Sequence, residues 1–121
     1  MKMALKTRRA GDVVLVDISG RIQLGPETSA FRDMVRELVE TSQFRILLNL
    51  ADVSYIDSCG LGELVSAFTR ITGAGGEIKL VNVSRRMTDL LQTTKLYTVF
   101  EVFDDEADAK RTRSGASPPK L

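Results

Sequence analysis

The sequence has no histidine, no tryptophan and only one cysteine, Cys59. Without histidine there is no imidazole base, so Ser-His-Asp and Cys-His catalytic sets are excluded, as are zinc sites built on histidine and cysteine. A single cysteine cannot form an internal disulfide, which fits a reducing cytoplasm. Because no histidine can deprotonate it, we expect Cys59 to be a small residue packed under a turn rather than a nucleophile.

The sequence also has no large excess of either charge and no long hydrophobic run. The 17 basic and 16 acidic residues give a net charge of +1, so the balance does not indicate nucleic acid or an anionic membrane as a partner. The apolar run at residues 13–16 is far too short for a signal sequence or a membrane span. With 121 residues, 43% of them hydrophobic, the chain is expected to fold as one globular domain.

Hydrophobic periodicity predicts strands that alternate with helices. Strands are expected at residues 4–8, 12–19, 44–50, 77–83 and 99–103, and helices at residues 27–41, 58–72, 85–94 and 104–111. Residues 21–25 and 51–57 are expected to be connections, and residues 112–121 a disordered tail. This order predicts an α/β fold, with a single-layer, mostly parallel sheet, an antiparallel N-terminal edge hairpin and about four helices packed on it.

Two further features bear on partners and ligands. The glycine cluster at residues 73–76 follows a helix and precedes a strand, so it is read as a helix C-cap and not as a phosphate-binding loop. The edge strand at residues 4–8 could pair with another chain, but its lysine and arginines disfavour this. We therefore expect a monomer or a weak dimer.

The most informative stretch is Asp57-Ser58-Cys59-Gly60-Leu61-Gly62, which follows the apolar run at residues 46–50 and opens a predicted helix. The first N–H groups of a helix have no internal partners, and the helix dipole places partial positive charge there. A phosphate on Ser58 would lie where an anion is favoured, and its removable charge would act as a switch. Alternatively, Ser58 only caps the helix, because serine is among the best N-cap residues.

In this order of elements, the motif resembles the STAS domain and, more narrowly, the bacterial anti-sigma factor antagonists. Segments 14–20, 48–56 and 75–83 are similar to the strands that surround the phosphorylation loop in that family. The resemblance implies a STAS domain over residues 3–111, followed by the tail.

The resemblance also implies a mechanism. The unphosphorylated protein would bind an anti-sigma factor and thereby free a sigma factor. That partner would have the histidine-kinase-like ATPase fold and act as a serine kinase on Ser58, and a metal-dependent serine phosphatase would reverse the reaction. The chain would be a substrate and not an enzyme, with no cofactor of its own. The expected partner-binding residues are Asp57, Ser58, Cys59, Gly60, Leu61, Gly62, Arg21 and Gln23.

Some of these positions carry more specific expectations. Cys59 stands where the family often has serine or threonine, which leaves Ser58 as the one hydroxyl in the motif. The segment at residues 21–24 lacks the acid that the family often has there, so Arg21 is read as a solvated loop arginine, with contact to a phosphate on Ser58 as the alternative. Gln23 keeps open a second reading, a STAS interaction or scaffold module that is never phosphorylated.

The remaining expectations concern packing and charge around Ser58. Gly60 and Gly62 are expected to leave room for close backbone approach. Leu61 is expected to be buried rather than exposed to a partner. Ser58 is expected to lie between two acids, Asp52 and Asp57.

Overall fold

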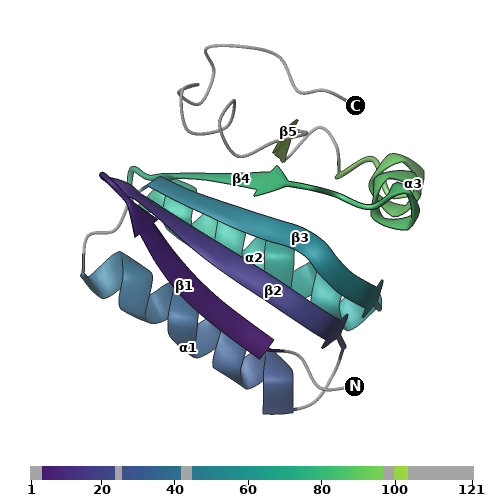
Figure 1. The fold of residues 1–121 in the computed structure, drawn as a ribbon, viewed down its shortest axis with the longest axis horizontal. Helices are drawn as coiled ribbons and strands as arrows, with labels where there is room; N and C mark the ends of the chain where they lie inside the picture. The colour runs from purple at the N-terminus through teal and green to yellow at the C-terminus, as the bar shows by residue number, and fades with distance from the viewer. Residues whose placement is uncertain (1–3, 24–25, 42–44, 97–99, 104–121) are drawn as a thin grey trace.

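The computed structural model describes residues 4–23, 26–41, 45–96 and 100–103. Strands and helices alternate after an initial hairpin (Figure 1). In chain order the elements are β1 (Ala4–Ala10), β2 (Val13–Ile22), α1 (Pro26–Glu40), β3 (Arg45–Ile56), α2 (Ser58–Gly73), β4 (Glu77–Val81), α3 (Arg85–Thr93) and β5 (Glu101–Phe103).

The strands form one sheet in the order β1-β2-β3-β4-β5. β1 and β2 are antiparallel, and every other neighbouring pair is parallel. This confirms the predicted α/β fold and its N-terminal hairpin. The described residues include three helices, and the predicted helix at residues 104–111 and tail at residues 112–121 lie outside them. None of the described helices is both long and apolar enough to span a membrane.

The main core lies between the sheet and the helices. In Figure 1, α1 and α2 lie side by side behind the strands. Alternate strand residues face them, and Val16, Leu48 and Leu80 are each at most 1% exposed. Their partners on α2, Leu64 and Ile71, are equally buried, as expected for a one-sided apolar stripe. The alternation of strand side chains thus fixes which face of the sheet packs against α1 and α2.

The opposite face of the sheet carries a second, smaller cluster. It includes a buried lysine, Lys79, whose Nζ lies 5.2 Å from the centre of the Phe103 ring. A cation over an aromatic face is attracted by the ring quadrupole, which offsets part of the desolvation cost. The apolar members of this cluster are Val13, Leu15, Leu47, Val81 and Phe103.

Polar side chains on the same face tie β1, β2, β3 and the segment after β4 together. Arg8 donates from Nε and Nη2 to the two carboxylate oxygens of Asp17, at 2.6 and 2.8 Å. Asn49 donates to Asp17 at 2.8 Å, and Asn82 donates to Asn49 at 3.1 Å. The hydrogen bond from Arg8 lowers the pKa of Asp17 against the opposing effect of burial. These contacts hold the register of β1, β2 and β3 near the middle of β2 and β3.

Both central strands extend further than the sequence predicted. β2 continues to Ile22 and β3 to Ile56, and the two residues pair in register. Register shifts near Gly20 let the strands stay paired, and the Ser54 hydroxyl donates to the Gly20 carbonyl at 3.1 Å. The predicted connections at residues 21–25 and 51–57 are therefore wrong for residues 21–22 and 51–56. Residues 24–25 lie outside the described part.

The turn after α2 was predicted correctly. The helix ends at Gly73, Gly75 has φ +90°, and the Gly76 N–H donates to the Ile71 carbonyl at 2.9 Å. A left-handed residue with bonds back to the last helical turn is a C-cap, as expected for the glycine cluster.

Candidate functional site

The start of α2 is held against the end of β2 by Asp57. The Asp57 carboxylate accepts a hydrogen bond from the Gly60 N–H at 2.7 Å, which makes Asp57 the N-cap of the helix. Its own N–H donates to the Ile22 carbonyl at 3.2 Å, and its carbonyl accepts from the Leu61 N–H at 2.9 Å. One residue therefore satisfies orphan backbone groups of α2 and joins the helix to the sheet.

Ser58 is not the cap, which corrects the simpler reading of this serine. It is the first residue of α2, and it is exposed. Cys59 is exposed as well, so the expectation that it packs under the turn is wrong. The first turn points these two side chains outward because Gly60 and Leu61 face the sheet. The motif therefore presents a hydroxyl and a thiol to solvent at a helix N-terminus.

The two glycines of the motif have different roles. A Cβ built on Gly60 would lie 2.1 Å from the Ile22 carbonyl oxygen, so only glycine fits where the helix crosses the end of β2. A Cβ on Gly62 would meet nothing within 4 Å. The expected close approach is thus confirmed at Gly60 and wrong at Gly62. Leu61 is 7% exposed, which confirms its predicted burial.

Arg21 and Gln23 lie beside the motif because β2 runs on past Gly20. The Arg21 guanidinium stacks over the Tyr55 ring at 4.4 Å from its centre, and its Nε donates to Gln23 Oε1 at 3.2 Å. Arg21 is half-buried and pairs with Tyr55 in the sheet register, so it is not a solvated loop arginine. The structure thus brings all eight predicted site residues to the carboxyl ends of β2 and β3 and the start of α2.

Tyr55 was missed as a site residue. It is 36% exposed, the large hydrophobic side chain most open to solvent in the described part of the chain. It precedes Asp57 by two residues, and its only sequence signal is an aromatic in a polar segment. Exposed aromatics beside a functional loop are typical of protein interfaces.

The acids around Ser58 are fewer than expected. Asp52 pairs with Ser19 and lies five residues before Asp57 along β3. Five residues of extended strand span about 16 Å, so Asp52 does not contribute to the immediate field of Ser58. The first turn of α2 contains no acid, and Asp57 is the neighbouring carboxylate.

The N-cap gives a first testable expectation. Replacing Asp57 with alanine should lower the free energy of unfolding by about 1 kcal/mol, because the Gly60 N–H loses its acceptor. Replacing it with asparagine should cost much less, since asparagine caps about as well. Urea denaturation of the two variants measures the difference. Equal losses would mean that the negative charge, and not the cap hydrogen bond, stabilises this end of the helix.

Comparison with known proteins agrees with this fold. The STAS domain family matches residues 4–109. The anti-sigma F factor antagonist of Paenibacillus polymyxa is 30% identical over 114 residues, which cover 90% of this chain and 93% of that protein. Among solved structures, a Thermotoga maritima protein assigned as an anti-sigma factor antagonist matches with a TM-score of 0.82 at 25% identity, over 88% of this chain and 92% of its own.

A second solved structure shows the same fold at lower identity. The Bacillus cell fate determinant SpoIIAA in its phosphorylated form matches with a TM-score of 0.70 at 19% identity, over 91% of this chain and all of its own. The family match and the curated relatives assign the chain to a class of regulatory, protein-binding α/β domains. The chain belongs to the STAS domain family, among relatives that are anti-sigma factor antagonists.

Proposed function

We propose that this chain is a cytoplasmic anti-sigma factor antagonist whose binding to an anti-sigma factor is switched off by phosphorylation of Ser58. The observation that carries the proposal is the position of Ser58, exposed at the first residue of α2 while Asp57 supplies the cap. The hydroxyl can therefore be modified without loss of the hydrogen bond that holds the helix start. The Paenibacillus polymyxa relative, an anti-sigma F factor antagonist, supports the same function.

The partner we propose is an anti-sigma factor of the histidine-kinase-like ATPase fold that also acts as the serine kinase. A metal-dependent serine phosphatase would restore the binding form. In this scheme ATP and magnesium belong to the kinase, and the present chain is a substrate. SpoIIAA, which shares the fold, exists in a phosphorylated form, and this supports phosphorylation of such a domain.

The surface around Ser58 has the features of a binding surface. Tyr55 presents an exposed ring, and Arg21 lies stacked on it beside the end of β2. Arginine and tyrosine are enriched among the residues that contribute most to protein interfaces. A partner that covers the surface of Arg21 and Tyr55 would also cover Ser58, which follows Tyr55 by three residues.

Phosphate on Ser58 would act on such an interface through charge. A helix N-terminus tolerates an anion, so the cost inside this domain is small. Buried in an interface, the same phosphate would be desolvated and placed near the nucleotide of a kinase partner. A loss of a few kcal/mol, about a hundredfold or more in affinity, follows from such a like-charge contact.

The test is intact-mass analysis after incubation with candidate anti-sigma kinases and ATP. We expect one added phosphate on the wild type and none on Ser58→Ala. The matched control is Ser84→Ala, because Ser84 is also an exposed serine at a helix start, where it caps α3 by accepting from the Met87 N–H at 3.2 Å. This control should still gain one phosphate.

Other results would change the assignment. A phosphate that persists in Ser58→Ala would move the site elsewhere. Stable binding to one of the kinases without any phosphate would favour the alternative, a STAS interaction or scaffold module that is never phosphorylated.

A further inference from the structure

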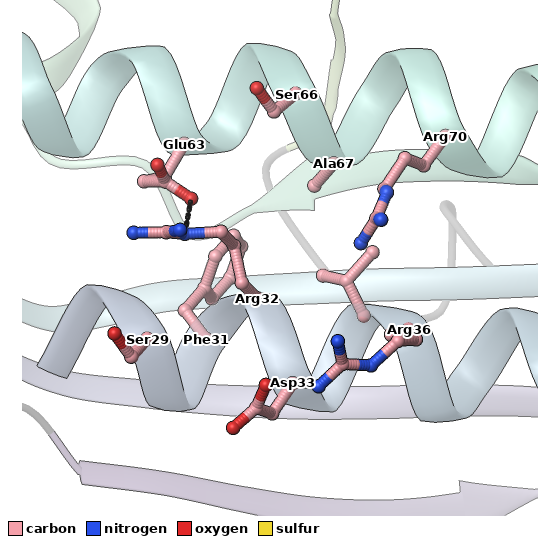
Figure 2. A pocket seen from close by; sticks show the side chains of 10 residues that line it. Ser29, Phe31, Arg32, Asp33, Arg36, Glu63, Ser66, Ala67 and Arg70 are labelled. Carbon is pink, nitrogen blue, oxygen red and sulfur yellow. Dashed lines mark hydrogen bonds and ion pairs between the residues drawn. The ribbon is translucent and has the colours of Figure 1, made fainter.

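A cavity between α1 and α2 lies outside the surface around Ser58. It has a volume of about 390 Å³ and is lined only by residues of the two helices. Figure 2 shows that side chains of both helices point into the space between them. A cavity of this size is at the lower end of the range that small-molecule sites occupy.

The cavity has an apolar floor. Phe31 and Val35 of α1 and Ala67 of α2 lie beneath it, each at most 2% exposed. These residues belong to the main core, so the floor is a fixed part of the fold. Because the floor is almost fully covered, a ligand that enters would contact mainly the apolar stems of the longer side chains at the sides.

The rim is rich in arginine. Arg32 and Arg36 come from α1 and Arg70 from α2, and Figure 2 shows Arg70 extended from α2 toward α1. Three arginines face two acids, Asp33 and Glu63, so the cavity keeps one net positive charge. Guanidinium groups bind phosphate and carboxylate with two parallel hydrogen bonds and also stack on flat apolar groups.

Each of the two acids pairs with one of these arginines. Arg32 Nε lies 3.0 Å from Glu63 Oε1, but that buried oxygen has no well-aligned hydrogen bond. Arg36 pairs with Asp33 within α1, and both side chains are more than half exposed. Such surface pairs contribute little and are readily exchanged. Arg70 has no carboxylate partner in the described part of the chain.

We propose that this α1–α2 cavity binds a small organic anion, a phosphate monoester with an apolar body, through Arg36 and Arg70. The phosphate would lie between the two guanidinium groups, which come from facing helices, and the apolar body would lie against the side-chain stems that cover Phe31 and Val35. The ligand would join α1 to α2 beside the Arg32–Glu63 ion pair. This inference does not depend on phosphorylation of Ser58.

Phenyl phosphate is a suitable probe, because it joins an aromatic ring to a phosphate. Inorganic phosphate and phenol serve as its two halves. In NMR titrations of the full chain, we expect saturable shifts of α1 and α2 amide signals at concentrations on the order of 1–10 mM, as a ligand of this size permits. Phenyl phosphate should bind more tightly than either half, and more weakly as salt rises.

Arginine substitutions test whether phenyl phosphate binds in this cavity. Arg70→Gln and Arg36→Gln should each weaken binding about tenfold, the effect of losing one charged hydrogen-bonding group. The matched control is Arg85→Gln, which removes an exposed arginine of α3 outside the cavity and should leave the affinity unchanged. All three side chains are exposed, so the variants are expected to fold, and their urea unfolding curves check this.

Three results would overturn the proposal. The first is the absence of saturable shifts in α1 and α2. The second is unchanged affinity in Arg70→Gln and Arg36→Gln. The third is equal affinity for phenyl phosphate and for one of its halves, because the proposal requires the guanidinium groups and the apolar side-chain stems to act together.

Discussion

Replacing Gly60 with alanine is expected to lower the free energy of unfolding by about 3 kcal/mol or more. The new Cβ would lie 2.1 Å from the Ile22 carbonyl oxygen and 2.8 Å from its carbonyl carbon. Both atoms belong to the backbone of Ile22, the last paired residue of β2, so no side-chain rotation relieves the overlap. Overpacking commonly costs about 1–3 kcal/mol, and a contact this short against fixed backbone belongs at or above the top of that range.

A movement of α2 that makes room for the new Cβ would also disturb the capping residue, Asp57. The Ile22 carbonyl that blocks the Cβ also accepts the Asp57 N–H at 3.2 Å. Moving α2 away from β2 to make room would lengthen that hydrogen bond and displace Ser58. Urea or thermal unfolding measures the loss, and partner binding should fall even in conditions where the variant stays folded.

Gly62→Ala is the matched control. Gly62 lies two residues further into the same helix, and its Cβ would meet nothing within 4 Å. Alanine has a higher helix propensity than glycine, so this variant should gain up to about 1 kcal/mol. Opposite signs for the two substitutions are therefore expected. Similar values for both would contradict the close crossing of α2 over β2.

The apolar interior was predictable because its signals are periodic. The stripe on α2 that contains Leu61 and Leu64 is visible in the sequence alone and correctly indicates buried side chains. Alternation along β2 correctly places Val14, Val16 and Ile18 on one buried face, but Val13 and Leu15 on the opposite face are buried too. The glycine cluster correctly marks the end of α2 at Gly73, whereas the sequence indicated Ser58 as the N-cap and the structure has Asp57 in that place. The order of strands and helices, and with it the fold class, follows from these local patterns.

The ends of β2 and β3 could not be predicted in the same way. Residues 51, 52, 54 and 55 are all exposed, so this part of β3 shows no alternation of apolar and polar residues. It is a strand because its backbone pairs with β2 through two register shifts, and backbone pairing leaves no trace in side-chain periodicity. The positions of Arg21 and Tyr55 at the site depend on that pairing, and for this reason they were misjudged or missed.

Replacing Ser58 with aspartate is expected to weaken binding to the anti-sigma factor about tenfold to a hundredfold. The partner is the one that the wild type binds in the phosphorylation assay. One carboxylate carries less charge than a phosphate, so the loss should not exceed that of the phosphorylated protein. Isothermal titration of both forms compares the two losses directly.

The free energy of unfolding of Ser58→Asp separates a loss of affinity at the interface from a loss of folded protein. An acid at the first residue of α2 interacts favourably with the helix dipole by about 0.3–1 kcal/mol, and the neighbouring Asp57 opposes it. The free energy of unfolding should therefore change by less than about 1 kcal/mol. A large fall in affinity with little change in stability is the signature of a charge effect at the interface.

Ser58→Asn is the matched control for size. Asparagine has nearly the shape of aspartate and no charge, so it should weaken binding by less than about fivefold if the interface rejects charge, as expected for a desolvated like-charge contact. Equal losses of affinity for asparagine and aspartate would mean that the size of the side chain, and not its charge, weakens binding. Unchanged affinity in both would place Ser58 outside the interface, and the surface of Arg21 and Tyr55 would then need another explanation.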